Sequence, residues 1–178
     1  MTKLRASDGA VLGTFATGVF PQGVAFDGAN IWVVNRCGSS SCTASSIGTV
    51  TKLRARDGTA LGTFPVGKLP SDIAFDGANL WITNGGTSSN PNNTVTKVRA
   101  SDGAILGTFA VGNVPSGLAF DGANIWVANF SSNSVTKLRA SDGMTLGTFP
   151  TGNNPNEVAF DGANIWVTNF SNGTVSKF

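Results

Sequence analysis

Few side chains in this sequence are of the types that take part in catalysis or bind metal ions. The chain has no histidine, and eight of its ten acidic residues are aspartates that stand directly before a glycine. General acid–base catalysis usually relies on histidine or on paired carboxylates tuned by burial, and neither arrangement is visible. The two other acids, Asp72 and Glu157, read as solvated loop residues. We therefore predict no catalytic residues, no metal site and no cofactor.

Two cysteines, Cys37 and Cys42, lie close together in the segment CGSSSC. Four intervening residues suit a small disulfide ring in a loop, whereas a structural zinc site requires four ligands. Two free thiols in a reducing compartment are the alternative, and the sequence leaves the two states open.

One phrase of eleven residues occurs four times, with small changes, at 25–35, 74–84, 119–129 and 159–169. Its last copy reads AFDGANIWVTN, and its tryptophans are Trp32, Trp81, Trp126 and Trp166, separated by 49, 45 and 40 residues. A period near 40 residues is typical of solenoids and propellers. The elements inside one period decide between them.

Each period contains four short runs rich in Val, Ile, Phe, Trp and Thr. Between 115 and 149 these runs cover 115–120, 124–129, 135–139 and 146–149, and Asp-Gly or Asn/Ser/Gly clusters separate them. Such runs are too short for helices, and Asp-Gly between apolar runs is a strong hairpin signal. Four strands in about 40 residues describe a propeller blade, whose strands we name A to D in chain order. We predict an all-β propeller with four repeats of about 40–49 residues.

The predicted single domain, 1–178, divides into repeat units of approximately 1–20, 21–69, 70–114, 115–154 and 155–178. The first strands, 2–5 and 11–15, are of types C and D, and the last, 155–160, 164–169 and 174–178, are of types A, B and C. An incomplete blade leaves an edge that can pair with another strand. We favour a homodimer that completes an eight-bladed ring; a four-bladed monomer ring and a fragment or higher oligomer are the alternatives.

Aromatic residues at fixed places in the repeat are expected to fill the wedge between adjacent blades. These inter-blade core residues are Trp32, Trp81, Trp126, Trp166, Phe26, Phe75, Phe120 and Phe160. A stacking platform for a ligand is the alternative role of the four tryptophans. We favour the core role because nearly the same residues surround the tryptophan in every repeat, as expected if each tryptophan packs in the same way.

The loops sort into two classes. The A–B and C–D turns are nearly invariant, whereas the D–A loops differ in sequence and the B–C loops differ in both length and sequence. Antiparallel order puts these differing loops on one face, the variable face, and such a face is often the binding face of a repeat protein. Drift of unconstrained loops is the alternative.

The variable face is nearly uncharged and rich in Asn, Ser, Thr and Gly, which suits a protein or a neutral glycan. The candidate ligand-binding residues are Phe20, Asn35, Arg36, Asn84, Asn129, Phe130, Asn169 and Phe170. For the four asparagines, which end the B strands, capping of a turn or bulge is the competing interpretation.

The net charge of +2 provides no strong field, so we predict neither nucleic-acid nor membrane partners. No apolar run approaches the roughly 18 residues that span a bilayer. The start, MTKLRASDGA, lacks the apolar core of a secretory signal. We expect a cytoplasmic chain as written, or an extracellular one if it is an excised piece, so the location stays open.

The repeat pattern PxxxAFDGxNIWVxN followed by VTKLxxxxGxxLGTFxVG resembles the YVTN/NHL-type propeller repeats, including streptogramin-lyase-like proteins. The resemblance covers essentially the whole chain and implies a fold rather than an activity. Lyases of this type rely on a histidine with a metal, which has no counterpart here. We expect a non-catalytic binding module; the alternatives are a structural or engineered scaffold that assembles through its incomplete blades and, least favoured, a lyase-like enzyme.

Overall fold

The chain forms seventeen β-strands and one short 3₁₀ turn in a computed structural model that describes residues 1–178. The first two sheets contain β1 (Thr2–Leu4), β2 (Val11–Thr14), β3 (Val19–Phe26), β4 (Asn30–Cys37), β5 (Ile47–Arg54) and β6 (Ala60–Lys68). The third and fourth contain β7 (Pro70–Phe75), β8 (Asn79–Thr87), β9 (Asn90–Arg99), β10 (Ile105–Ala110), β11 (Pro115–Phe120), β12 (Asn124–Asn129), β13 (Ser134–Arg139) and β14 (Thr145–Pro150). The fifth contains β15 (Pro155–Phe160), β16 (Ile165–Asn169) and β17 (Thr174–Lys177), and η1 (Phe130–Ser132) follows β12.

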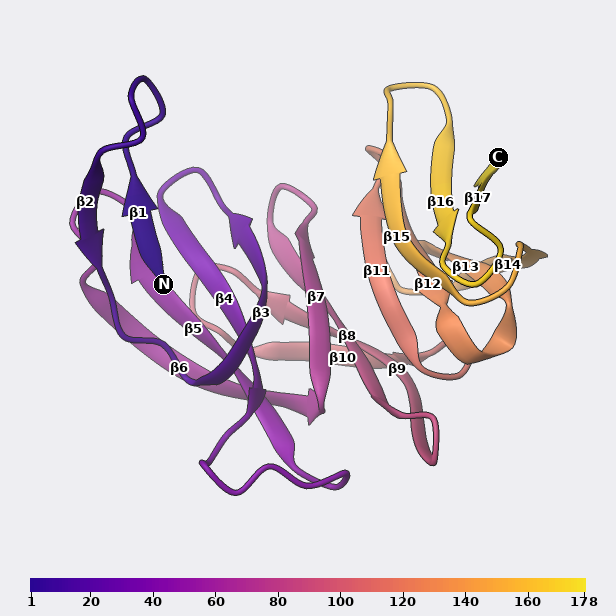
Figure 1. Ribbon diagram of the computed structural model, residues 1–178, viewed down its shortest axis with the longest axis horizontal. Helices are drawn as coiled ribbons and strands as arrows, with labels where there is room; N and C mark the ends of the chain where they lie inside the picture. Colours follow the sequence, from indigo (N-terminus) through magenta and orange to yellow (C-terminus); the bar gives the residue numbers. More distant parts are fainter.

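Five separate antiparallel sheets result, with two, four, four, four and three strands in chain order. They stand side by side along an open arc, with the first and fifth sheets at opposite ends (Figure 1). The A strands β3, β7, β11 and β15 contact one another in turn. The predicted all-β class is confirmed, and the arrangement is propeller-like. No helix in the structure is long and apolar enough to span a membrane.

The invariant Asp-Gly turn between A and B strands is held by its aspartate. Asp27 Oδ1 accepts hydrogen bonds from the backbone N–H groups of Ala29 (2.9 Å) and Asn30 (2.7 Å). Its Oδ2 accepts one from Trp32 Nε1 at 2.7 Å. Burial opposes ionisation, but the hydrogen bonds outweigh it and lower the pKa of Asp27. The repeated phrase therefore links turn and tryptophan in a single unit.

The same aspartate–indole bond recurs in the other copies of the phrase. It joins Asp76 to Trp81, Asp121 to Trp126 and Asp161 to Trp166, at 2.7–2.8 Å. The glycine after each aspartate has a φ of +97° or +98°. Residues with a side chain rarely adopt this backbone conformation, whereas glycine adopts it readily.

The core lies between the sheets. Trp32 of the second sheet packs with Leu80 and Val98 of the third in one cluster, and Trp81 of the third sheet packs with Ile125 and Leu138 of the fourth in the next. Trp32, Trp81 and Trp126 are at most 7% exposed, which agrees with their predicted core role. Phe75 and Phe120 are partly buried against the same two clusters.

Three predicted core residues are not buried, and each lies in or beside an end sheet. Trp166 is 38% exposed because no further sheet follows β15–β17. Phe26 is 55% exposed because it lies beside the first sheet, which lacks A and B strands. Phe160 is 38% exposed on β15, an edge strand of the fifth sheet. The same repeat position is therefore buried to different degrees in different sheets.

Candidate functional site

A polar cavity of about 470 Å³ lies among the four A strands. Apart from proline and glycine, its lining residues are Gln22, Ser71, Asp72, Ser116, Asn156 and Glu157. They stand near the beginnings of their strands, beside the D–A loops of the variable face.

A second cavity of about 300 Å³ adjoins the first and shares Ser71, Ser116 and Asn156 with it. Arg36, Phe130 and the segment 85–88 line its other side. We call the two cavities together the variable-face groove. The structure therefore brings together two of the predicted ligand-binding residues, Arg36 and Phe130.

The two acids of the groove alternate with glycines at the third position of the PxxxAF motif in successive A strands: Gly23, Asp72, Gly117 and Glu157. A Cβ atom at Gly23 would lie 2.7 Å from Asp72 Oδ1, and one at Gly117 would lie 2.9 Å from Glu157 Oε2. Each glycine thus leaves room for the carboxylate of the next strand. Contrary to the sequence-based interpretation, both acids lie on strands rather than in loops, and both line the cavity; Asp72 is partly buried, whereas Glu157 is exposed to solvent.

The environment of the groove disfavours charge on both acids. Burial raises the pKa of Asp72 above its ordinary value, although backbone hydrogen bonds from Ile73 and Leu118 oppose the rise. Burial and the neighbouring charge of Asp72 both raise the pKa of Glu157. A hydrogen-bond donor or a cationic group placed between them would relieve this penalty.

Glu157→Gln is expected to raise the midpoint of thermal unfolding at pH 7, by no more than about 4 °C because solvent screens the half-open side chain. The amide removes a charge that burial and Asp72 both penalise. As the pH falls through the raised pKa, the folded wild type binds a proton and the advantage shrinks. Below the ordinary value of 4.5 the carboxyl is protonated in both states, so the advantage disappears.

Thermal unfolding of the wild type and of Glu157→Gln, followed at several pH values between 7 and 4, measures this effect. Asp142→Asn is the matched control, because a backbone hydrogen bond from Met144 and contact with Arg139 lower the pKa of Asp142. That change should lower the midpoint at pH 7. A gain for Glu157→Gln that stays constant down to pH 4 would contradict the raised pKa.

The four asparagines predicted to end the B strands are buried, at most 3% exposed, and are not placed to contact a ligand; β4 and β8 continue two or three residues beyond theirs. In Asn35, Oδ1 accepts a hydrogen bond from Gly18 N–H (2.9 Å), and Nδ2 donates to Thr49 Oγ1 (3.1 Å) and Thr51 Oγ1 (2.9 Å). Asn84 and Asn129 make the corresponding three bonds. In Asn169 Nδ2 donates twice, whereas Oδ1 has no partner. The amides of Asn35, Asn84 and Asn129 hold the D–A loop to the sheet, and Asn169 is buried in the same way. We therefore remove all four from the proposed binding residues.

The remaining aromatic candidates lie outside the two cavities. Phe20 is 54% exposed and has a left-handed φ of +52°, directly before Pro21, which lines the first cavity. Phe170 is 73% exposed, and its ring centroid lies 6.4 Å from that of Phe130. Both rings therefore border the groove from the side of the D–A and B–C loops.

The two long B–C insertions are hydrogen-bonded to each other and together form one wall of the groove. Cys37 and Cys42 form a disulfide, with 5.6 Å between their Cα atoms, in the first insertion. The adjacent Arg36 donates through Nη2 to the Gly86 carbonyl of the second insertion at 3.1 Å. Asn90 Nδ2 donates to the Ala44 carbonyl at 3.4 Å, so two hydrogen bonds connect the insertions.

The chemistry that this arrangement supports is hydrogen bonding. Hydroxyl, amide, carboxylate and guanidinium groups line the groove, and Phe130 adds one aromatic ring. No group of three or more His, Cys, Asp or Glu side chains is placed to hold a metal ion.

The sequence matches no protein-family model and no curated protein. Among solved structures, a functionally unknown protein from Desulfotomaculum acetoxidans DSM 771 is 19% identical, with a TM-score of 0.74 over 99% of this chain and 61% of that chain. Kuenenia stuttgartiensis hydrazine synthase is 15% identical, with a TM-score of 0.78 over 99% of this chain and 64% of that chain. The computationally designed Ika8 protein is 12% identical, with a TM-score of 0.72 over 98% of this chain and 51% of that chain.

At these identities the likeness shows a shared fold and nothing about activity. The chain spans less than two thirds of the length of each of these three proteins. The resemblance of the repeats to the YVTN/NHL type stays a prediction.

Proposed function

We propose that this chain is a non-catalytic binding module that holds a protein segment or a neutral glycan in the variable-face groove. The supporting observation is the pair of adjoining cavities that share Ser71, Ser116 and Asn156. Ligand sites are typically concave and carry a small number of convergent polar groups. The D–A and B–C loops that border the groove are also the parts that differ between repeats.

The groups in the groove indicate how a ligand would be oriented. Asp72 and Glu157 favour hydroxyl or amino donors in the larger cavity, whereas Arg36 favours a carbonyl or hydroxyl acceptor in the smaller one. Phe130 offers a face for a sugar ring or an apolar side chain. A ligand with donors at one end and acceptors at the other therefore fits best.

We also propose that the five sheets are three complete and two incomplete propeller blades, with the repeat units given above. The support is the repeated A-B-C-D strand order and the repeated tryptophan packing between sheets.

Asn156→Trp tests the groove. Asn156 lines both cavities and makes no side-chain hydrogen bond, so an indole there would fill the groove without removing an internal contact. Ligands are first sought with the wild type on arrays of neutral oligosaccharides and of peptides. We expect the variant to bind any such ligand at least about tenfold more weakly, with an unchanged circular dichroism spectrum.

Asn113→Trp is the matched control, since Asn113 is exposed on the same face and lines neither cavity. It should bind like the wild type. Equal binding by Asn156→Trp and the wild type would overturn the assignment of the groove. A wild type that binds nothing on either array would support the ligand-free scaffold instead.

A further inference from the structure

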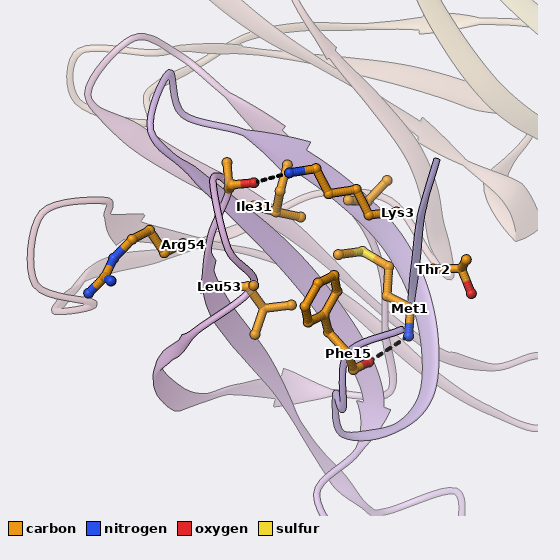
Figure 2. A pocket seen from close by; sticks show the side chains of 10 residues that line it. Met1, Thr2, Lys3, Phe15, Ile31, Leu53 and Arg54 are labelled. Atoms are coloured by element: carbon orange, nitrogen blue, oxygen red, sulfur yellow. Dashed lines mark hydrogen bonds between the residues drawn. The ribbon is translucent and has the colours of Figure 1, made fainter. Parts of the chain in front are cut away.

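An apolar pocket of about 300 Å³ lies between the first and second sheets. Figure 2 shows Met1, Phe15, Ile31 and Leu53 around it. Val24 on β3 also lines the pocket and is 58% exposed. An open pocket lined by apolar side chains is a part of the hydrophobic core that no side chain fills.

The interface between the second and third sheets shows what fills this space elsewhere. Ile73, Leu80 and Val98 occupy the repeat positions of Val24, Ile31 and Leu53, and they are at most 5% exposed. They pack against Trp32 and Val34 of the B strand β4. The first sheet has only C-type and D-type strands, so its pocket lacks a B strand with a tryptophan.

The missing group is present at the other end of the chain. Trp166 on the B strand β16 is 38% exposed, whereas the other three tryptophans are at most 7% exposed. Its indole is held as in the other repeats, by Asp161 at 2.7 Å and by Lys177 Nζ at 5.1 Å from the ring centroid. The ring is therefore oriented for packing but has no sheet to pack on.

A chain of lysine contacts is interrupted at the same place. Lys3, Lys52 and Lys97 each donate through Nζ to two backbone carbonyls in the C–D turn of the following sheet, at 2.6–3.2 Å. Lys137 lies over Trp126 in the same way (4.8 Å) but has no carbonyl partner. Ala6 and Ser7 in the C–D turn of the first sheet occupy the positions of these acceptors and receive no lysine.

We propose that two copies of the 178-residue chain complete one another's end sheets. β15 and β16 of one copy add to the free edge of β1 in the other, and Trp166 enters the apolar pocket beside Phe15 of that copy. Internal sheets set the register, because Trp32 pairs with Lys52, Trp81 with Lys97 and Trp126 with Lys137. Trp166 therefore pairs with Lys3 of the other copy.

The occupant is a second copy rather than the same chain, because the end sheets of one copy lie at opposite ends of the arc (Figure 1). The two contacts are identical and related by a two-fold axis, so the assembly closes. The free edge of β1 is thereby covered in each copy.

β1 and β17 occupy the same C position, so one of them must leave the completed sheet. β1 is anchored to the second sheet by Lys3, whereas no carbonyl accepts a hydrogen bond from Lys177. β17 is the displaced strand. Phe178 then leaves Trp126 and Phe149, and Lys137 reaches the carbonyls of Ala6 and Ser7 of the other copy.

This proposal uses the end sheets and not the variable-face groove, so its failure and that of the proposed function are separate results. Light scattering on the purified 178-residue chain should give twice its mass of 18.2 kDa. Trp166→Ala should raise the dimer dissociation constant at least about 30-fold, as loss of a buried interface tryptophan does. Ile105→Ala removes an exposed side chain from β10 of the third sheet, away from both end sheets, and should leave the constant unchanged.

Two lysine variants test the displaced strand. Lys137→Met should weaken the dimer without unfolding the monomer, since Lys137 has no carbonyl partner in the single chain. Lys177→Met, which also removes a lysine above a tryptophan but one whose contact exists only in the single chain, should leave the dimer at least as tight as the wild type. A monomeric wild type, or a Trp166→Ala dimer of wild-type affinity, would overturn the proposal; a dimer weakened by Lys177→Met and not by Lys137→Met would overturn the displacement of β17.

Discussion

Trp81→Ala is expected to lower the free energy of unfolding by about 3–5 kcal/mol, the usual cost of removing a buried tryptophan. The indole is fully buried between the third and fourth sheets, where it packs with Leu118 and Ile125. Phe109 lies with its ring centroid 5.4 Å away, and Lys97 Nζ is 4.9 Å from the indole centroid. Truncation would leave a cavity and remove the hydrogen bond to Asp76, so two sheets would lose their shared core together.

Urea unfolding followed by circular dichroism measures this loss. Trp166→Ala is the matched control, because it removes the same residue of the repeat from a position that is 38% exposed in the single chain. At protein concentrations low enough to keep the chain monomeric, it should cost less than half as much. Equal losses for the two variants under those conditions would mean that the tryptophans do not stabilise the fold by packing between sheets.

The strand order could be predicted from the sequence because Asp-Gly turns separate short runs of residues that favour β-strands. The last strands were expected at 155–160, 164–169 and 174–178, and they lie at Pro155–Phe160, Ile165–Asn169 and Thr174–Lys177. Burial was predicted less well. A tryptophan at a fixed repeat position is buried only when a sheet follows it, and the local sequence around Trp166 carries no information about that neighbour.

For the candidate site, too, some residues could be predicted from the sequence and others could not. Arg36 and Phe130 could be placed on the groove because loops that differ between repeats gather on one face. Asp72 and Glu157 were missed because they lie on strands 85 positions apart in the chain that meet only when the A strands surround one cavity.

A usable signal for the asparagines was present in the sequence. Glycine stands 17 residues before each of them, at Gly18, Gly67, Gly112 and Gly152, even though the loops between repeats vary. A constant spacing of this kind indicates a conserved internal contact rather than a ligand contact. In three of the four pairs that contact is a hydrogen bond from the glycine N–H to the asparagine Oδ1.

Asn84→Ala is expected to lower the free energy of unfolding by about 2–4 kcal/mol, because it leaves buried polar groups without partners. Asn84 is fully buried; its Oδ1 accepts from Gly67 N–H at 3.1 Å, and its Nδ2 donates to Thr94 and Thr96 at 3.1 and 2.9 Å. The Gly67 N–H would lose its acceptor in a space that water cannot easily reach. The threonine hydroxyls would lose a donor, which adds a smaller penalty because hydroxyl groups can rotate.

The matched control is Asn169→Ala, in which the same repeat position is changed in the fifth sheet. Asn169 Oδ1 has no partner, and its Nδ2 bonds to Thr174 and Ser176 on a strand that is largely open to solvent. We therefore expect a loss of only about 1 kcal/mol. Urea unfolding of both variants, together with array binding, separates the two interpretations of these asparagines. A ligand-contacting Asn84 would lose binding while keeping wild-type stability, whereas an internal one would lose stability first, and any weakening of binding would follow the unfolded fraction.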